Sequence, residues 1–426
     1  MPEDNTTLRW VVRRGDAGKG SFVFINNYER TGRGTRPTMP PKELVRFALH
    51  INGSSAPLAI PSAKSDPLTI PSDVWAVWPV DLALFEPAAS APVLVHATAQ
   101  LVARVKGAAG TGEILFVVET EGVPAEFAFS GAVTAELGKA TVSKEGEISV
   151  FREITAGTSA FASATSGAAT VRIVLLPAAM ADSVWLQTLA GTERLFVTDS
   201  TTTPDVLVMS DDETLHFRTS MLSNSPQQLR MFPALSSLKH ADGSAVPSTI
   251  DGVFTAFTPN VENVSLAAPT ISHVRAAGPA RNVSQGGKQA REPTMEEWAA
   301  AAVWNLTLTE AIPTTGGDYK LRVDYAGDAA RLYFSDRCLT DNWQSGYKSE
   351  GAMEVGLNFL AGENPGLLEK GAQLQLWILP ITKYDLSKPH IWLEPRLWPD
   401  FGGADSALKL SDVSVGGLVY TDLTAA

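Results

Sequence analysis

The chain has 426 residues, of which 44% are hydrophobic and 19% charged, so it can form two to four globular domains with apolar cores. Its formal net charge of −12 argues against a nucleic-acid-binding protein, which needs a basic face, and against adhesion to an anionic membrane. The charge favours solubility and an uncharged or weakly charged ligand.

The first residues, Met1 to Thr7, are polar and lack the basic and apolar regions of a signal peptide. No run of about 18 apolar residues, the length that spans a membrane, occurs in the sequence. We therefore expect a cytoplasmic location for the chain as given. The alternative is an extracytoplasmic chain cut from a longer precursor.

Short apolar runs, rich in β-branched and aromatic residues, follow one another along the chain and are separated by Gly, Pro, Asp and Ser. Runs of strand length cover 22–25, 44–51, 93–105, 114–118, 127–129, 171–176, 194–197, 206–209, 304–308, 319–325, 330–334 and 374–379. Turn signals every 8–12 residues or so are typical of sandwiches and barrels. We predict an all-β protein with two to three antiparallel β-sandwich or jelly-roll domains.

Turns and boundaries follow from glycine and small polar residues. Gly15 to Gly18 and Glu145-Gly146 predict hairpin turns, and residues 107–112 a turn or linker. The Ala/Ser/Thr/Gly-rich segment 156–170 predicts a loose loop, and 199–204 a connection near a domain edge. We place domains at 1–106, 107–204 and 205–426.

One short helix is predicted where Thr294 and Glu297 fit a capping box, with Thr294 as the N-cap and Glu297 at the third helical position. The locally basic segment 276–291 before it predicts an exposed loop inserted in the last domain.

Candidate catalytic and metal-binding residues are few. The carboxylates at Glu119 and Glu121, at 211–213 and at 296–297 have no context that specifies a pair for sugar hydrolysis, so we interpret them as solvated. The six histidines have no metal-ligand spacing, and no nucleophile elbow, phosphate loop or dinucleotide fingerprint occurs. A triad assembled in space stays open. We expect no metal ion and no cofactor.

The only cysteine, Cys338, excludes an intrachain disulfide and a zinc site made of several thiolates. We expect it to be a small buried residue within a strand.

Aromatic residues beside Asp and Asn give the one candidate binding site. Asp341, Asn342, Trp343 and Tyr347 place rings next to polar groups, the chemistry that stacks on a sugar and binds its hydroxyls. The alternative is core packing with polar groups satisfied in a turn. For Trp377, inside an apolar run, core packing is the stronger interpretation.

The segments 321–334, 339–346 and 353–357 resemble the C-terminal jelly roll of family 35 glycoside hydrolases, the β-galactosidases. That pattern is a strand ending in Tyr-x-Gly-Asp-x-Ala-x-Leu, an Asp-Asn-aromatic turn and a strand with Gly-Leu, and it places Val355 and Leu357 on one inward face. The N-terminal part resembles the strands that follow the catalytic barrel in this family. The matching segments there are 22–30, 59–62, 70–73, 77–80 and 98–101.

The resemblance implies a galactose-binding-like last domain and a first domain like the first one after the barrel. It also implies retaining chemistry by two glutamates on a (β/α)₈ barrel of about 250 residues. Neither glutamate segment occurs here, nor does the alternation of strands and helices that a barrel needs. No catalytic residue is therefore carried over.

The leading hypothesis is that the chain is a non-catalytic β-sandwich region or subunit of a β-galactosidase-like enzyme. It would support a barrel partner and contact a galactoside or other glycan. The alternatives are a free-standing carbohydrate-binding protein, a structural assembly subunit and a hydrolase with an unfamiliar site.

Overall fold

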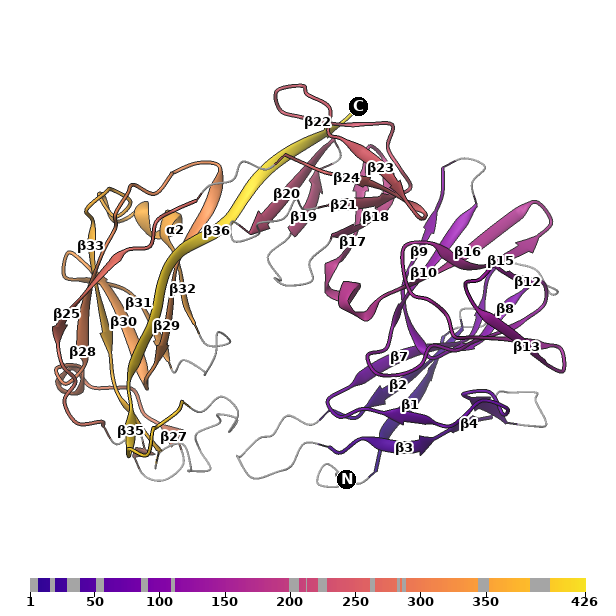
Figure 1. Cartoon of the computed structure of the whole chain (residues 1–426), viewed down its shortest axis with the longest axis horizontal. Helices are drawn as coiled ribbons and strands as arrows, with labels where there is room; N and C mark the ends of the chain where they lie inside the picture. The colour runs from indigo at the N-terminus through magenta and orange to yellow at the C-terminus, as the bar shows by residue number, and fades with distance from the viewer. Residues whose placement is uncertain are drawn as a thin grey trace.

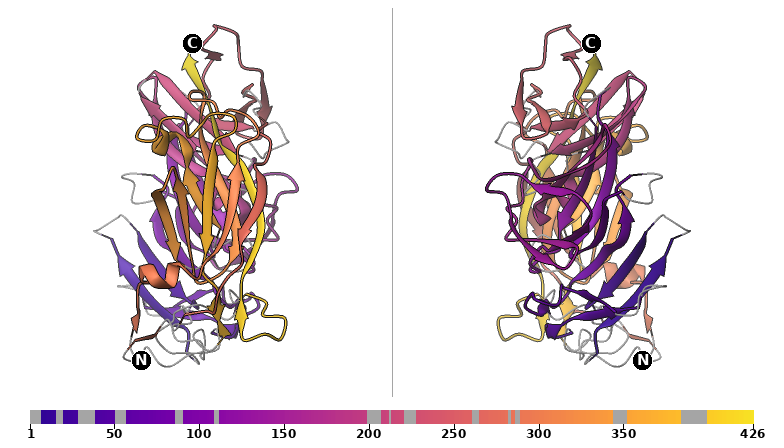
Figure 2. Two further views of the ribbon diagram at one scale, coloured as in Figure 1. Left: turned by 90° about the vertical axis from the view of Figure 1, so that its left-hand side faces the viewer. Right: turned by 90° about the vertical axis from the view of Figure 1, so that its right-hand side faces the viewer.

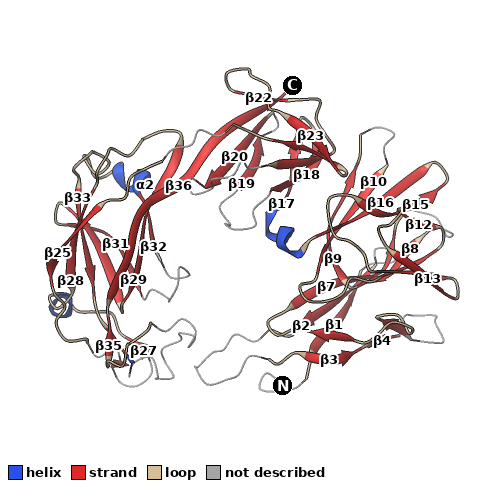
Figure 3. Cartoon of the chain, in the orientation of Figure 1, coloured by secondary structure: helices blue, strands red, loops and turns tan. Residues whose placement is uncertain are grey.

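The structure is a computed structural model that describes residues 7–15, 20–28, 39–50, 57–85, 91–108, 112–198, 207–211, 213–220, 228–260, 265–281, 284–285, 289–343, 352–383 and 399–426. Strands dominate these residues, so the predicted all-β class is confirmed (Figure 3). The helices are all short: η1 (Ala178–Ser183), α1 (Met295–Trp298) and α2 (Leu357–Ala361). The sequence indicated only α1.

Five sheets follow one another along an arch (Figure 1). The first sheet has seven strands. In spatial order they are β1 (Arg9–Arg14), β2 (Ser21–Asn26), β7 (Trp75–Ala83), β8 (Val93–Ala97), β11 (Phe127–Ser130), β14 (Ile148–Arg152) and β13 (Thr141–Glu145). Two hairpin-like pairs cover part of it. They are β3 (Lys42–Val45) with β6 (Leu68–Ile70), and β4 (Phe47–Leu49) with β5 (Leu58–Ile60).

The second sheet lies inside the stack and is buried on both faces. Its strands are β12 (Val133–Ala135), β15 (Ala160–Ser166), β16 (Ala169–Leu176), β10 (Glu113–Glu119) and β9 (Ala99–Lys106). Leu115 and Val117 of β10 pack toward the first sheet, while Ile114, Phe116 and Val118 pack toward the third. Strands buried on both faces have continuous apolar runs, and β10 pairs in parallel with β16, as such buried strands often do.

The third sheet contacts the second on one face and the fourth on the other. Its strands are β17 (Val184–Leu189), β18 (Thr192–Thr198), β21 (Leu229–Phe232), β24 (Phe254–Phe257) and β23 (Ser248–Asp251). Along β18, Leu195 and Val197 lie in the core shared with the second sheet, and Phe196 lies in the core shared with the fourth.

The fourth sheet is organised around β36 (Lys409–Ala425), the longest strand described, which joins two cores. The other strands are β19 (Leu207–Asp211), β20 (Thr214–Ser220), β29 (Gly317–Ala326), β32 (Met353–Gly356) and β22 (Leu238–His240). Val413, Val415 and Val419 enter the core of the last sandwich, and Leu423 enters the core against the third sheet. At Gly417 a Cβ would lie 2.1 Å from the Asp318 carbonyl oxygen, so only glycine fits at this point of the pairing between β36 and β29.

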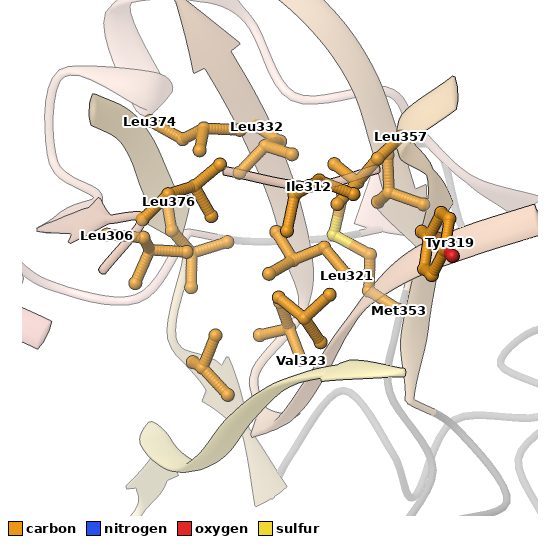
Figure 4. Packing of buried hydrophobic residues seen from close by; sticks show 14 of the residues in the cluster. Leu306, Ile312, Tyr319, Leu321, Val323, Leu332, Met353, Leu357, Leu374 and Leu376 are labelled. Atoms are coloured by element: carbon orange, nitrogen blue, oxygen red, sulfur yellow. The ribbon is translucent and has the colours of Figure 1, made fainter. Parts of the chain in front are cut away.

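The fifth sheet closes the last sandwich against the fourth. Its strands are β25 (Thr270–Arg275), β28 (Ala302–Thr307), β33 (Gln373–Ile378), β30 (Ala329–Phe334) and β31 (Arg337–Trp343). Figure 4 shows Leu306, Leu332, Leu374 and Leu376 of this sheet facing Leu321 and Val323 of β29. Figure 2 (left) shows the strands of this last sandwich side by side, in front of the rest of the chain. Two small pairs complete the described strands: β26 (Ser284–Gln285) with β27 (Gln289–Ala290), and β34 (Ile381–Thr382) with β35 (Ser406–Ala407).

Several local predictions can be compared with these elements. The Glu145-Gly146 hairpin is confirmed, because β13 pairs with β14 around it. The capping box is also confirmed: Thr294 accepts from the Glu297 amide, and the Glu297 side chain accepts from the Thr294 amide. The loose loop over 156–170 is wrong, because β15 lies within it and pairs with β16. Small side chains there pack between crowded strands, which composition alone does not reveal.

The expected strand through Val355 and Leu357 ends earlier. The strand β32 stops at Gly356, and Leu357 is the first residue of α2. Both side chains still enter the same core. The predicted boundary at 106/107 falls in the turn between β9 and β10, where the Gly107 amide donates to the Gly112 carbonyl oxygen at 2.7 Å. The connection predicted at 199–204 lies outside the described residues. The division into three domains stays a prediction.

Candidate functional site

Asp341, Asn342 and Trp343 lie in a strand, not in a turn. They belong to β31, the edge strand of the fifth sheet, where Asp341 is opposite Arg331 and Asn342 is opposite Ala330. Neighbouring residues of a strand face opposite sides of its sheet, so Asp341 and Asn342 cannot face one ligand together. The predicted turn is therefore wrong. Tyr347 and the side chain of Trp343 lie outside what the structure describes.

Asp341 lies on the outer face of the sheet beside a positioned arginine. Its Oδ2 is 4.0 Å from Arg331 Nε, and its side chain is 46% exposed. The Arg331 guanidinium lies over the ring of Trp298, 4.4 Å from the ring centre, which orients it by a cation–π contact. A carboxylate and an oriented guanidinium at an open sheet edge can bind hydroxyl groups.

Asn342 faces the other way and supports the core. Its backbone carbonyl oxygen accepts from the Tyr325 hydroxyl at 3.3 Å. Burial, together with the nearby negative charge of Asp328, raises the pKa of Tyr325 above its usual value, so this phenol stays protonated. The place of Asn342 in the fold is thus explained by packing.

The segment 276–291 is held to the sheet more firmly than the prediction of an exposed loop allows. The Arg281 side chain is only 2% exposed, and its Nε lies 2.5 Å from Asp328 Oδ2. Arg291 pairs with Glu297 through two hydrogen bonds, one of them 2.8 Å long. The Arg275 guanidinium covers Trp377, 4.9 Å from its ring centre. Arg281 and Arg291 are therefore paired with acidic side chains, and the expected exposure is wrong for Arg281.

A buried carboxylate network in the N-terminal half was not visible in the sequence. Glu126, which is 4% exposed, precedes β11 and accepts from the Ser62 amide at 2.7 Å. Its Oε1 lies 3.0 Å from His96 Nε2, and its Oε2 accepts from Arg152 Nε at 3.0 Å and from the Ser65 hydroxyl. The network joins β8, β14 and the loop before β6. A lone glutamate before an apolar strand gave no signal of it.

Burial alone would raise the pKa of Glu126, but hydrogen bonds from His96, Ser62 and Ser65 outweigh it and lower the pKa to about 2. Both oxygens already have donors, so this carboxylate has no free position for a substrate. Its geometry is that of a structural clamp.

A third feature is an apolar surface on strands β1, β2 and β7. In the register, Val11 is opposite Phe24 and Phe24 is opposite Val77, while Asn26 is opposite Trp75. These side chains point away from the core formed by Val23, Ile25 and Trp78. Val11, Phe24 and Trp75 are 47%, 40% and 64% exposed. We call Val11, Phe24, Trp75 and Val77 the N-terminal apolar face.

Cys338 is exposed in β31, so the expectation of a buried cysteine is wrong. It occupies an outward position of an edge strand, opposite Tyr333. Trp377 is half-buried on the outer face of the same sheet, so packing between strands accounts for it, as the sequence suggested.

Among the described residues, no group of three or more His, Cys, Asp or Glu side chains is arranged to hold a metal ion. In the same part of the chain, no helix is long and apolar enough to cross a membrane.

Comparisons with known proteins give no family model and no curated protein that matches the chain. Among solved structures, a rhamnosidase from Novosphingobium sp. PP1Y matches 53% of this chain at 13% identity and a TM-score of 0.18. A GH31 alpha-xylosidase from Xanthomonas citri matches 100% of it at 8% identity and a TM-score of 0.13. The chain spans only 25% and 38% of those two proteins. Both are glycoside hydrolases, and the likeness in space is weak.

Proposed function

We propose that this chain is the non-catalytic β-sandwich region of a β-galactosidase-like glycoside hydrolase and that it supports a catalytic (β/α)₈ barrel. The sequence resemblance to the post-barrel part of family 35 enzymes supports the proposal at both ends of the chain. The stacked sandwiches are the architecture that this resemblance implies. Contact with a galactoside near Asp341 is part of the same proposal.

The observation that carries the proposal is the N-terminal apolar face. A solvated face of an antiparallel sheet is normally polar, and exposed contiguous apolar side chains mark an interaction site. Trp75 and Phe24 are large aromatic side chains, the type that dominates the binding energy of protein interfaces. The strands that carry them include the segments 22–30 and 77–80, which resemble the strands next to a barrel.

Binding of a barrel is tested by co-expression with the barrel that the adjacent genomic sequence encodes. We expect the double variant F24S/W75S to weaken the association at least tenfold, because each loss of a central aromatic contact costs about 2 kcal/mol or more. Both side chains are exposed, so the thermal unfolding of the variant alone should match that of the parent.

L137S is the matched control, since Leu137 is fully exposed at 101% but lies in the turn before β13, away from this face. Equal association of F24S/W75S and L137S would contradict the proposal. So would an adjacent sequence that encodes no barrel.

The alternative is a free-standing carbohydrate-binding protein. The arrangement of Asp341, Arg331 and Trp298 favours it, because all three side chains come from this chain and no partner is needed to form the site. Galactoside binding by the chain alone that is lost in D341A, together with no association with a barrel, would favour that alternative.

A further inference from the structure

Strand β1 is a free edge of the first sheet. It pairs with β2 over all six of its residues, from Arg9 opposite Asn26 to Arg14 opposite Ser21, with no bulge. Among the described residues, no strand pairs with its other side. Such an edge offers a row of backbone N–H and C=O groups to an incoming strand.

The edge lacks several of the features that usually protect one. It has no proline or bulge, and its centre is apolar: Trp10, Val11 and Val12 are 45%, 47% and 38% exposed. The opposite edge of the same sheet, β13, differs: beside one exposed apolar residue, Val142, it carries Ser143 and Lys144, which bond to Arg152 and Ser149. The two edges of one sheet are therefore chemically unlike.

The charge of β1 is also unusual. The chain carries a formal charge of −12, yet the six residues of this strand include Arg9, Arg13 and Arg14 and no acid. Arg13 and Arg14 are exposed and form no ion pair within 4.0 Å with the described residues. Arg13 and Arg14 are therefore open to a carboxylate from outside.

The same charges disfavour a second copy of the chain as the occupant. Antiparallel pairing of β1 with itself about a twofold axis between Val11 and Val12 places Arg9 opposite Arg14 and Trp10 opposite Arg13. Like charges directly opposite each other destabilise a strand pair. An acidic segment replaces this repulsion by attraction.

We infer that the free edge of β1 binds an extended acidic segment of a partner protein by strand addition. Main-chain hydrogen bonds supply the affinity, and carboxylates opposite Arg13 and Arg14 with β-branched residues opposite Val11 and Val12 supply the selectivity. The inference does not rest on the proposed function: Val11 belongs to both surfaces, but the backbone edge of β1 and the side chains of Arg13 and Arg14 are not part of the N-terminal apolar face.

The probe is a labelled, end-capped peptide, Glu-Glu-Val-Val-Thr-Glu, which complements β1 in antiparallel register. Fluorescence anisotropy with the full chain measures its binding. We expect the peptide with Lys in place of Glu to bind at least tenfold more weakly. Two further peptides are N-methylated at every other amide, one at the odd and one at the even positions. Only one of these two sets of amides points toward β1, and we expect a similar loss of binding for the peptide in which that set is methylated.

The matched chain variants are R13E/R14E and K64E, of which K64E alters an exposed lysine between β5 and β6, outside β1. R13E/R14E should bind the Glu peptide at least tenfold more weakly and should prefer the Lys peptide, a reversal that misfolding cannot produce. Equal binding of the parent chain to both N-methylated peptides and to the unmethylated one would overturn strand addition. Sedimentation of the chain alone tests the other occupant. If the parent chain forms a dimer whose stability is altered by R13E/R14E and not by K64E, the edge binds a second copy of the chain and the inference is overturned.

Discussion

Replacing Glu126 by alanine is expected to lower the free energy of unfolding of the N-terminal half by about 3–5 kcal/mol. Removing one partner of a buried charged network costs that much because the remaining groups stay buried without compensation. Here the groups left behind are buried His96 and the Ser62 amide, whereas Arg152 keeps Glu145 as a partner at 3.0 Å. Urea unfolding followed by intrinsic fluorescence measures the change.

The control is E113A, which removes the Glu113 partner of Arg104 at 2.6 Å on the surface, where both side chains are about a third exposed. Exposed pairs contribute roughly 0–1 kcal/mol, so this variant should unfold nearly as the parent does. Equal destabilisation by E126A and E113A would show that the buried network is not a clamp.

The same network predicts a dependence of stability on pH. The pKa of Glu126 is about 2 in the folded chain against an ordinary value of 4.5, so its contribution is fully present above pH 4.5. That contribution, on the order of 3 kcal/mol, is lost as the pH falls from 4.5 toward 2, because the unfolded chain takes up the proton first. In E126A this part of the acid destabilisation should disappear.

Replacing Phe116 by alanine is expected to cost about 3–5 kcal/mol, the usual loss for a buried phenylalanine. Phe116 is fully buried in β10, and its ring lies 5.7 Å from that of Phe232 and 5.4 Å from that of Phe254. Those two rings come from the third sheet, so the cavity forms between two layers. We expect the urea concentration at the midpoint of the first unfolding transition to be lower for F116A than for the parent chain.

The control for this variant is F359A, because Phe359 is 88% exposed on α2 and its loss should change stability by no more than about 0.5 kcal/mol. If F116A unfolds with the midpoint of F359A, the second and third sheets do not share a core.

Local sequence signals predicted local structure well. The glycine after Glu145 and the capping pair Thr294 and Glu297 act over two to four residues, so the sequence states them directly. Apolar runs located most strands, but period two described β10 poorly, because five consecutive residues of it are buried. The strands that cover the two faces of β10 are distant from it in sequence, so a local pattern does not identify them.

The longest strand and the buried carboxylate were missed for the same reason. Gly416-Gly417 resembles a break in β36, yet a Cβ at Gly417 would lie 2.1 Å from the Asp318 carbonyl oxygen, so glycine is needed at that position. Glu126 gains its role only when Ser62, His96 and Arg152 meet around it. In the candidate site, Asp341 was found on the surface, but the turn that would have joined it to Asn342 is a strand.

The most direct test of the proposed function is hydrolysis of a chromogenic β-galactoside by the purified chain, alone and together with the barrel encoded beside it. We predict no turnover by the chain alone or by the variant D341A. With the barrel present, we predict hydrolysis, and F24S/W75S should restore it less well than the parent chain or L137S. Robust hydrolysis by the lone chain would contradict the account.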